Sequence, residues 1–240
     1  MTGKAKQIAG VLFDWDLTLA KPTGNISHSE RLTMLFQRGG FPCTNEDVVK
    51  AIEAHQVGTH ENNNTIVAAP QTQKEIIAYY RHLLATLGYT DISWERLAAL
   101  YHDYAYLPTS LYDDVLPTLR KLRRTGVALG IISNHTPAAR GIMQSYLRGF
   151  IKPDHIIISD EIGAHKPMPS VFMQAATALD LLPQQCLFVG DNLHVDAIGS
   201  VQEGGFQLGL WLDRKHETWD EPLPDGIIRI TSLAQVIDFL

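Results

Sequence analysis

The chain has 240 residues, of which 45% are hydrophobic and 19% charged, and this is the composition of a soluble globular protein that can bury a sizeable core. Its net charge of −6 excludes the basic field that favours nucleic acid or an anionic membrane. Cys43 and Cys186 lie far apart in sequence, which excludes a cysteine metal cluster and predicts reduced thiols in a cytoplasmic protein.

The first apolar run, Ile8 to Phe13, predicts a buried strand, and it is too short for a signal peptide or a membrane span. Asp14-Trp15-Asp16 follows at once. If the backbone stays extended past the strand end, these two carboxylates lie on the same side, because alternate strand residues share a face. Neighbouring carboxylates repel unless a metal or a shared proton compensates, which indicates chemistry. The alternative is a strand followed by a polar turn.

Residues 21–108 contain few strand-like runs and several amphipathic ones, which predict four helices. The first begins with a possible capping box, Ser27 and Glu30, and the second is expected to bury Val48, Val49 and Ile52. The expected helices run from near Ser27 to Gly39, from Thr44 onward, from about Thr72 to Gly88 and from about Ser93 to Tyr106. Gly58 to Gln71 is expected to be a polar loop.

From Tyr112 onward, apolar strands alternate with helices. The expected strands are Val127 to Ile132, His155 to Ile158, Cys186 to Val189 and Phe206 to Leu212; the expected helices are Asp114 to Arg124, Pro137 to Leu147, Met168 to Leu181, His194 to Glu203 and Ser232 to Leu240. This pattern predicts an α/β fold with a Rossmann-like parallel sheet covered on both faces. We expect residues 1–20 and 109–240 to form this core, and residues 21–108 to be an inserted all-helical cap domain over the sheet edge.

Polar residues follow two further strands of the predicted sheet. Ser133-Asn134 ends the second strand and precedes a helix, which predicts either an anion site or a helix cap. After the third strand, Lys166 lies between a glycine turn and two prolines. There it can place a positive charge on a phosphate or remain a solvated loop side chain.

The fourth strand ends in Asp191-Asn192, and Asp196 follows in the next helical turn. A carboxylate at a strand end suits a hard cation, with Asp196 orienting the ligands; the alternative is a helix cap beside an exposed acid. Parallel sheets bind ligands at the carboxyl ends of their strands. Four successive strand ends with such residues therefore predict a single site.

Taken in order, Asp14-Trp15-Asp16-Leu17-Thr18, Ser133, Lys166-Pro167 and Asp191 through Asp196 resemble the four motifs of the haloacid dehalogenase-like (HAD) hydrolase superfamily. The resemblance covers the whole core, and the insertion resembles the helical C1-type cap of that superfamily. These motifs are specific for the superfamily but not for a substrate. Leu17 departs from the pattern, because many phosphatase members have glycine or aspartate there, which leaves open the geometry of the flap beside the site.

The resemblance implies a Mg²⁺-dependent phosphatase that acts on a small phosphorylated metabolite. Asp14 would attack phosphorus and form an aspartyl phosphate, and Asp16 would protonate the leaving alcohol and later activate water. Mg²⁺ would be held by the carboxylates of Asp14 and Asp191 and the main-chain carbonyl of Asp16. The implied phosphate-binding residues are Ser133, Asn134 and Lys166. Asp196 and Asn192 would contact the metal ligands and orient them without binding the metal themselves.

Other functions remain open on this scaffold. A 2-haloacid dehalogenase would not need Asp16 or Asp191, and a phosphonatase would need a cap lysine, for which Lys50 and Lys74 are the candidates. A phosphomutase and a non-catalytic binding module are further alternatives. Substrate choice is expected to lie in the cap, where His55, His60 and Asn62 to Asn64 either reach the site or form a solvated loop. Trp15 and Tyr112 either shape the site or belong to the core. We expect a monomer or homodimer.

Overall fold

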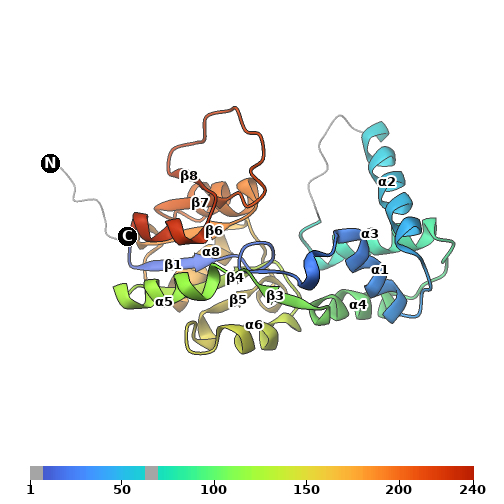
Figure 1. The fold of residues 1–240 in the computed structure, drawn as a ribbon, viewed down its shortest axis with the longest axis horizontal. Coiled ribbons are helices and arrows are strands. Elements are labelled where there is room, and N and C mark those ends of the chain that lie inside the picture. Colours follow the sequence, from blue (N-terminus) through green and yellow to red (C-terminus); the bar gives the residue numbers. More distant parts are fainter. Residues whose placement is uncertain (1–7, 63–69) are drawn as a thin grey trace. The chain divides into compact units, whose positions relative to one another are not determined.

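The computed structural model describes residues 8–62 and 70–240 and divides the chain into two compact units (Figure 1). The first unit comprises the chain up to Lys21 together with Ser110–Asn134 and Arg140–Leu240. The second comprises Pro22–Thr109 and the short segment His135–Ala139. The chain passes between the units through two short paired strands, β2 (Ala20–Pro22) and β3 (Thr109–Leu111), which the sequence did not predict.

Within the described residues, the first unit is built on a six-stranded parallel sheet with the order β5-β4-β1-β6-β7-β8. Its strands are β1 (Gly10–Phe13), β4 (Ala128–Ser133), β5 (Ile156–Ile158), β6 (Cys186–Gly190), β7 (Leu208–Leu212) and β8 (Ile227–Ile230). β1 and β6 are buried along their whole length, as expected for central strands covered on both faces. The edge strand β8 was not predicted. The sheet confirms the predicted α/β fold.

Helices cover the sheet of the first unit. They are α5 (Val115–Thr125), α6 (Ala139–Leu147), α7 (Ser159–Ile162), α8 (Pro169–Ala178) and α9 (Gly199–Gln202), with the 3-10 helices η3 (Pro153–His155), η4 (Pro183–Gln185) and η6 (Leu233–Phe239) and the π-helical turn η5 (Leu193–Ile198). The face of α8 that carries Phe172 packs against Leu12 and Phe188 of the sheet. The sequence predicted one α-helix over 194–203 and another over 232–240, whereas the structure has η5 followed by α9, and η6.

The second unit is a helical bundle. Its elements are η1 (Thr23–Asn25), α1 (His28–Arg38), α2 (Asn45–Asn62), α3 (Gln73–Thr86), α4 (Trp94–Asp103) and η2 (Tyr104–Tyr106). Capping boxes begin two of them, with Ser27 and Glu30 at α1 and Thr72 and Glu75 at α3. The bundle buries apolar side chains of all four α-helices in one cluster, which contains leucines and aromatic residues of α1, α3 and α4 and Val48 and Ala51 of α2.

The prediction of a polar loop from Gly58 to Gln71 is partly wrong, because α2 continues to Asn62. A glycine in a helix interior costs about 1 kcal/mol relative to alanine, which a long packed helix tolerates. The rest of that loop, residues 63–69, lies outside the described residues. Val48 of α2 is buried as predicted, whereas Val49 and Ile52 are only half-buried. None of the helices in the described part of the chain has the length and hydropathy needed to cross a membrane.

Candidate active site

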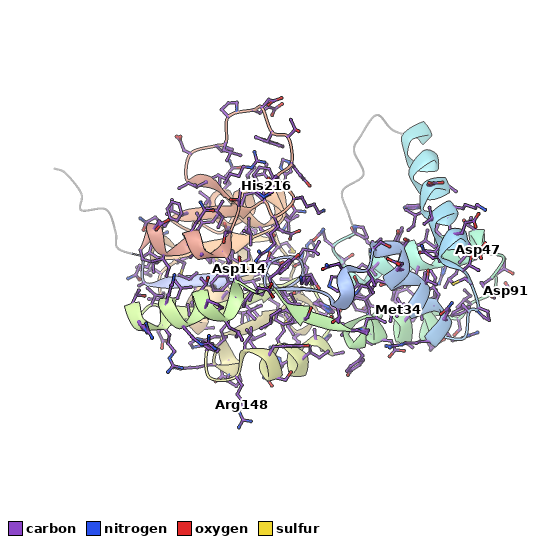
Figure 2. The ribbon with its side chains drawn as sticks, viewed as in Figure 1. Met34, Asp47, Asp91, Asp114, Arg148 and His216 are labelled. Carbon is purple, nitrogen blue, oxygen red and sulfur yellow. The ribbon has the colours of Figure 1, made fainter. Side chains whose placement is uncertain are left out.

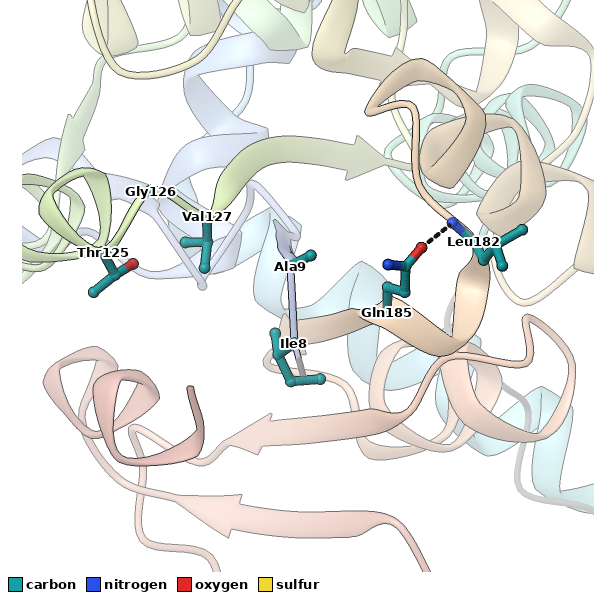
Figure 3. A pocket seen from close by; sticks show the side chains of 7 residues that line it. All are labelled: Ile8, Ala9, Thr125, Gly126, Val127, Leu182 and Gln185. Carbon is teal, nitrogen blue, oxygen red and sulfur yellow. Dashed lines mark hydrogen bonds between the residues drawn. The ribbon is translucent and has the colours of Figure 1, made fainter. Parts of the chain in front are cut away.

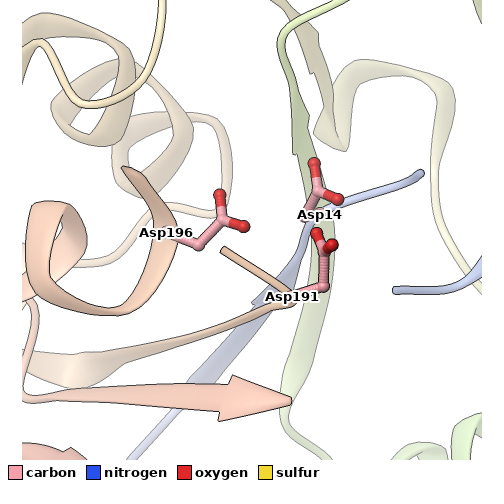
Figure 4. A group of neighbouring side chains, drawn as sticks. All are labelled: Asp14, Asp191 and Asp196. Carbon is pink, nitrogen blue, oxygen red and sulfur yellow. The ribbon is translucent and has the colours of Figure 1, made fainter. Parts of the chain in front are cut away.

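Three carboxylates from two neighbouring strand ends and η5 gather at the carboxyl edge of the sheet (Figure 4). Phe13 pairs with Val189, so Asp14 and Asp191 follow adjacent strands at almost the same level. One oxygen each of Asp14, Asp191 and Asp196 lie within 4.8 Å of one another. The register of the parallel sheet therefore brings together side chains that are far apart in sequence.

Lys166 lies inside this acidic cluster, although it comes from the loop before α8. Its side chain is 2% exposed, and its Nζ donates to Asp14 Oδ1 at 2.6 Å and to Asp196 Oδ1 at 2.8 Å. The ammonium also lies 5.1 Å from the centre of the Phe188 ring. Lys166 is therefore a buried charge between two carboxylates, and not a solvated loop residue.

The acids in the cluster are difficult to ionise together. Burial raises the pKa of Asp14 to about 7; the charge of Lys166 opposes this and that of Asp196 adds to it. Burial and the charges of Asp14 and Asp196 raise the pKa of Asp191 to about 8. Burial alone would lower the pKa of Lys166, but the two carboxylates beside it hold the pKa above its usual value. The site thus carries a permanent cation and an excess of carboxyl groups.

This donor set fits a magnesium ion. Carboxylate oxygens are the ligands that Mg²⁺ prefers, and Asp14 and Asp191 supply them from two adjacent strand ends. A divalent cation would compensate the charge that Lys166 leaves unbalanced. Both oxygens of Asp196 are already bonded, Oδ1 to Lys166 and Oδ2 to the amide N–H of Asn192 at 3.0 Å. Asp196 is thus placed to orient the site.

Asp16 lies in a tight turn directly after β1. The carbonyl of Trp15 accepts hydrogen bonds from the amides of Leu19 and Ala20, at 3.0 and 2.9 Å, and the Leu17 amide donates to the Ala20 carbonyl at 2.7 Å. Leu17 has φ +58° and is 39% exposed. Its backbone has the left-handed conformation that glycine adopts without strain. Leu17 therefore adopts the backbone conformation of the glycine that many phosphatase members have there, and the turn is formed with leucine in that position.

Thr18 joins this turn to the next strand end. It is fully buried, and its Oγ1 accepts the amide N–H of Asp191 at 3.0 Å. The carbonyl of Asp191 in turn accepts a hydrogen bond from Trp211 Nε1 at 3.0 Å. The backbone of Asp191 is therefore fixed on both sides. Thr18 belongs to the first motif, but the local sequence shows neither its bond to Asp191 nor that of Trp211.

Ser133 and Asn134 lie at the end of β4 and just after it. Ser133 is buried. The side-chain amide of Asn134 bonds the Lys166 backbone at both ends: Nδ2 donates to the Lys166 carbonyl at 3.0 Å, and Oδ1 accepts from the Lys166 amide at 2.8 Å. These bonds make Asn134 a positioning residue for Lys166. The helix expected from Pro137 begins at Ala139, two residues later than predicted.

The other predicted residues have mainly structural contacts. Asn192 caps η5, because its Oδ1 accepts the amides of His194 and Val195 at 3.0 and 2.9 Å. Trp15 is buried and packs against Tyr146.

The predicted cap residues lie in the second unit. His55 of α2 packs against Tyr79 and His82 of α3, with ring centres 5.1 and 4.6 Å away. The side chains of His60 and Asn62, and all of residues 63–64, lie outside the described part of the structure.

A hollow lies at the opposite, amino edge of the sheet (Figure 3). It has a volume of about 500 Å³ and is lined by Ile8, Ala9, Thr125, Gly126, Val127, Leu182 and Gln185. None of these lining residues is ionisable, so this hollow lacks the groups for acid, base or metal chemistry. The carboxyl edge remains the candidate active site.

Comparison with known proteins points to one family. Residues 8–202 match the family model described as haloacid dehalogenase-like hydrolase. A glyceraldehyde 3-phosphate phosphatase of Methanopyrus kandleri is 33% identical over 52% of this chain and 55% of that protein. An (S)-2-haloacid dehalogenase of Pseudomonas sp. (strain YL) is 33% identical over 56% of each chain. The chain thus spans about half the length of these relatives.

The fold is also shared with solved structures. The putative HAD-hydrolase YfnB of Bacillus subtilis, solved bound to magnesium, superimposes with a TM-score of 0.70 at 20% identity, over 97% of this chain and 98% of that one.

Proposed function

Because this chain belongs to the haloacid dehalogenase-like hydrolase family, we propose that it is a Mg²⁺-dependent phosphatase acting on a small phosphorylated metabolite. The observation that carries the proposal is the buried cluster in which Asp14 and Asp191 lie together beside Lys166, with Asp16 in the turn that follows. Phosphoryl transfer needs a nucleophile, compensation of charge and a proton donor, and Asp14, Lys166 and Asp16 would supply them. The matched phosphatase of Methanopyrus kandleri supports the same reaction class.

In the first step, a carboxylate oxygen of Asp14 attacks phosphorus and the bond from phosphorus to the ester oxygen breaks. Asp16 gives its proton to the departing alcohol, which leaves an aspartyl phosphate on Asp14. Lys166 holds Oδ1 of Asp14 at 2.6 Å, and this orients the carboxylate and attracts the phosphoryl oxygens. Asp16 then takes a proton from water, the hydroxide attacks phosphorus, and inorganic phosphate departs with regeneration of Asp14.

The carboxylates of Asp14 and Asp191 and the main-chain carbonyl of Asp16 would hold Mg²⁺. When bound, the ion supplies positive charge that neutralises the phosphate and favours the ionised form of Asp14. Burial raises the pKa of Asp14, and a cation beside its carboxylate would oppose this rise. Ser133 and Lys166 would bind phosphoryl oxygens, and Asn134 would keep Lys166 in place.

A haloacid dehalogenase is the second candidate, since a relative with that name has the same 33% identity as the matched phosphatase. Such an enzyme would use Asp14 as nucleophile but would not need Asp16 as a proton carrier or Asp191 as a metal ligand. The gathering of Asp191 with Asp14 and Asp196 favours the phosphatase. A phosphonatase is less well supported, because Lys50 is exposed and paired with Glu46 at 2.7 Å, and Lys74 is exposed.

The test is hydrolysis of p-nitrophenyl phosphate by the full chain. We expect turnover with Mg²⁺, none with excess chelator, and none by Asp14→Asn. Chloride release from a 2-chloroacid without metal would instead identify a dehalogenase, and isomerised hexose phosphate would identify a phosphomutase. A panel of phosphorylated metabolites assayed with Mg²⁺ would then identify the substrate.

A further inference from the structure

Arg214, which follows β7, joins the turn after Asp14 to the start of α5. Its guanidinium forms a two-pronged ion pair with Asp114, from Nη1 to Oδ2 at 3.1 Å and from Nη2 to Oδ1 at 3.0 Å. Nη2 also donates to the carbonyl oxygen of Thr18 at 2.8 Å. The two side chains are 15% and 23% exposed. Such a partly buried, bidentate pair is strong and has a fixed geometry.

The ion pair is itself anchored. Asp114, labelled in Figure 2, also accepts the amide N–H of Leu233 at 3.0 Å and the hydroxyl of Ser232 at 3.4 Å. Burial would raise the pKa of Asp114, but the hydrogen bonds and charge of Arg214 outweigh it and lower the pKa below its usual value. The guanidinium lies 3.8 Å from the centre of the Tyr112 ring. Arg214 is therefore held on several sides and has little freedom to move.

The residue that Arg214 holds is central to the proposed chemistry. The hydroxyl of Thr18 accepts a hydrogen bond from the Asp191 amide, and its carbonyl accepts one from the Arg214 guanidinium. Thr18 is thus fixed by groups from two other segments. Asp16 lies two residues before it in the same turn. The turn also contains Leu17 in the left-handed conformation, which costs a leucine about 1–2 kcal/mol. Backbone of this kind persists only where its surroundings hold it.

We propose that Arg214 is a positioning residue for Asp16. By holding the Thr18 carbonyl, it keeps the strained turn closed and sets the Asp16 carboxyl against the leaving oxygen. Its hydrogen bonds go to Asp114 and to the Thr18 carbonyl, so in this role Arg214 acts through the turn. Asp14 and Lys166 are held by other contacts, so loss of Arg214 impairs protonation of the leaving group more than attack on phosphorus. This inference rests on the proposed phosphatase function.

The test is the dependence of rate on the leaving group in Arg214→Met. p-Nitrophenol leaves readily without a proton, whereas phenol and simple alcohols need one. We expect kcat for p-nitrophenyl phosphate to fall less than about threefold, and kcat for phenyl and alkyl phosphates to fall roughly 10- to 100-fold, with KM little changed. Arg214→Lys should recover part of the loss, because a lysine can still reach one partner. Equal losses for all esters would overturn the inference.

Arg140→Met is the matched control. Arg140 pairs with Glu161 and donates to the carbonyls of Pro153 and Ile156 at 3.0 and 2.8 Å, so it too combines an ion pair with carbonyl contacts. These partners belong to α7, η3 and β5, and not to the turn after Asp14. We expect Arg140→Met to leave the dependence on leaving group unchanged, and a dependence like that of Arg214→Met would overturn the inference.

A second measurement separates this inference from the proposed function. The amides of Leu19 and Ala20 bond to the Trp15 carbonyl, and they should exchange with solvent faster in Arg214→Met than in the parent chain or in Arg140→Met. Unchanged exchange would overturn the role of Arg214 whether or not the chain hydrolyses phosphate. Faster exchange in Arg214→Met, together with a parent chain that hydrolyses no ester, would confine the failure to the proposed function.

Discussion

Replacing Lys166 by methionine removes the ammonium group from the buried acidic cluster at nearly constant side-chain volume. Asp14 and Asp196 then face each other without the charge that now lies 2.6 and 2.8 Å from them. The two carboxylates are then buried without their counter-charge, and removing one partner of a buried ion pair in this way costs roughly 3–5 kcal/mol. For a chain of this size it lowers Tm by about 10 °C.

The destabilisation is expected to increase with pH. Loss of the Lys166 charge raises the pKa of Asp14 further above the value of about 7 that it has in the parent chain, so the destabilisation grows as the pH rises above 7 and shrinks as the pH falls below 7. The assay is urea unfolding at pH 7.5 and pH 5.5 with chelator present. Lys50→Met is the control, since the exposed pair of Lys50 with Glu46 should contribute less than about 1 kcal/mol. A Lys166→Met protein that is as stable as the control variant at pH 7.5, or that loses more stability at pH 5.5, would refute this reasoning.

Three further outcomes are expected. Mg²⁺ at about 100 times its Kd should stabilise the parent chain by about 2.7 kcal/mol in thermal unfolding, and Asp191→Asn should lose this response. Without metal and above pH 8, Asp191→Asn should unfold at a higher temperature than the parent. The reason is that the raised pKa of about 8 means that ionised Asp191 destabilises the fold. Leu17→Gly should change the free energy of unfolding by less than about 1 kcal/mol, whereas Leu17→Val should lose 1 kcal/mol or more, because a β-branched residue is strained at φ +58°; equal effects of the two would contradict the strain. Gly190→Ala should abolish turnover, since its methyl group would lie 2.3 Å from Asp196 Oδ2, whereas Gly141→Ala, which meets nothing within 4 Å, should keep full activity.

The fold and the location of the site were predictable because they depend on local patterns. Runs such as Ile8 to Phe13 are apolar enough to identify central strands, and parallel strands must present their carboxyl ends at one edge. That topology alone predicts that Asp14 and Asp191 meet. The edge strand β8 was missed because its short run follows a long polar segment. The length of α2 was missed because Gly58 suggested an end that packing of the helix overrides.

The contacts that organise the site could not be predicted, because they join residues distant in sequence. Asn134 has the same local pattern whether it binds an anion or the Lys166 backbone, and only the fold places Lys166 against it. Arg214 likewise lies in a segment without a motif, and its bond to Thr18 depends on the order of β1, β6 and β7 in the sheet. A sequence can therefore identify which chemical groups reach the edge, while tertiary packing decides which of them bind substrate and which orient the others.

The central claim is that Asp14 becomes phosphorylated during turnover. The most direct measurement is rapid acid quenching of the full chain with Mg²⁺ and p-nitrophenyl phosphate, followed by mass spectrometry of the peptide that contains Asp14 and Asp16. The account predicts one phosphoryl group on Asp14 in the parent chain and none in Asp14→Asn. Turnover of the ester without a phosphorylated Asp14 peptide, or with undiminished activity of Asp14→Asn, would contradict it.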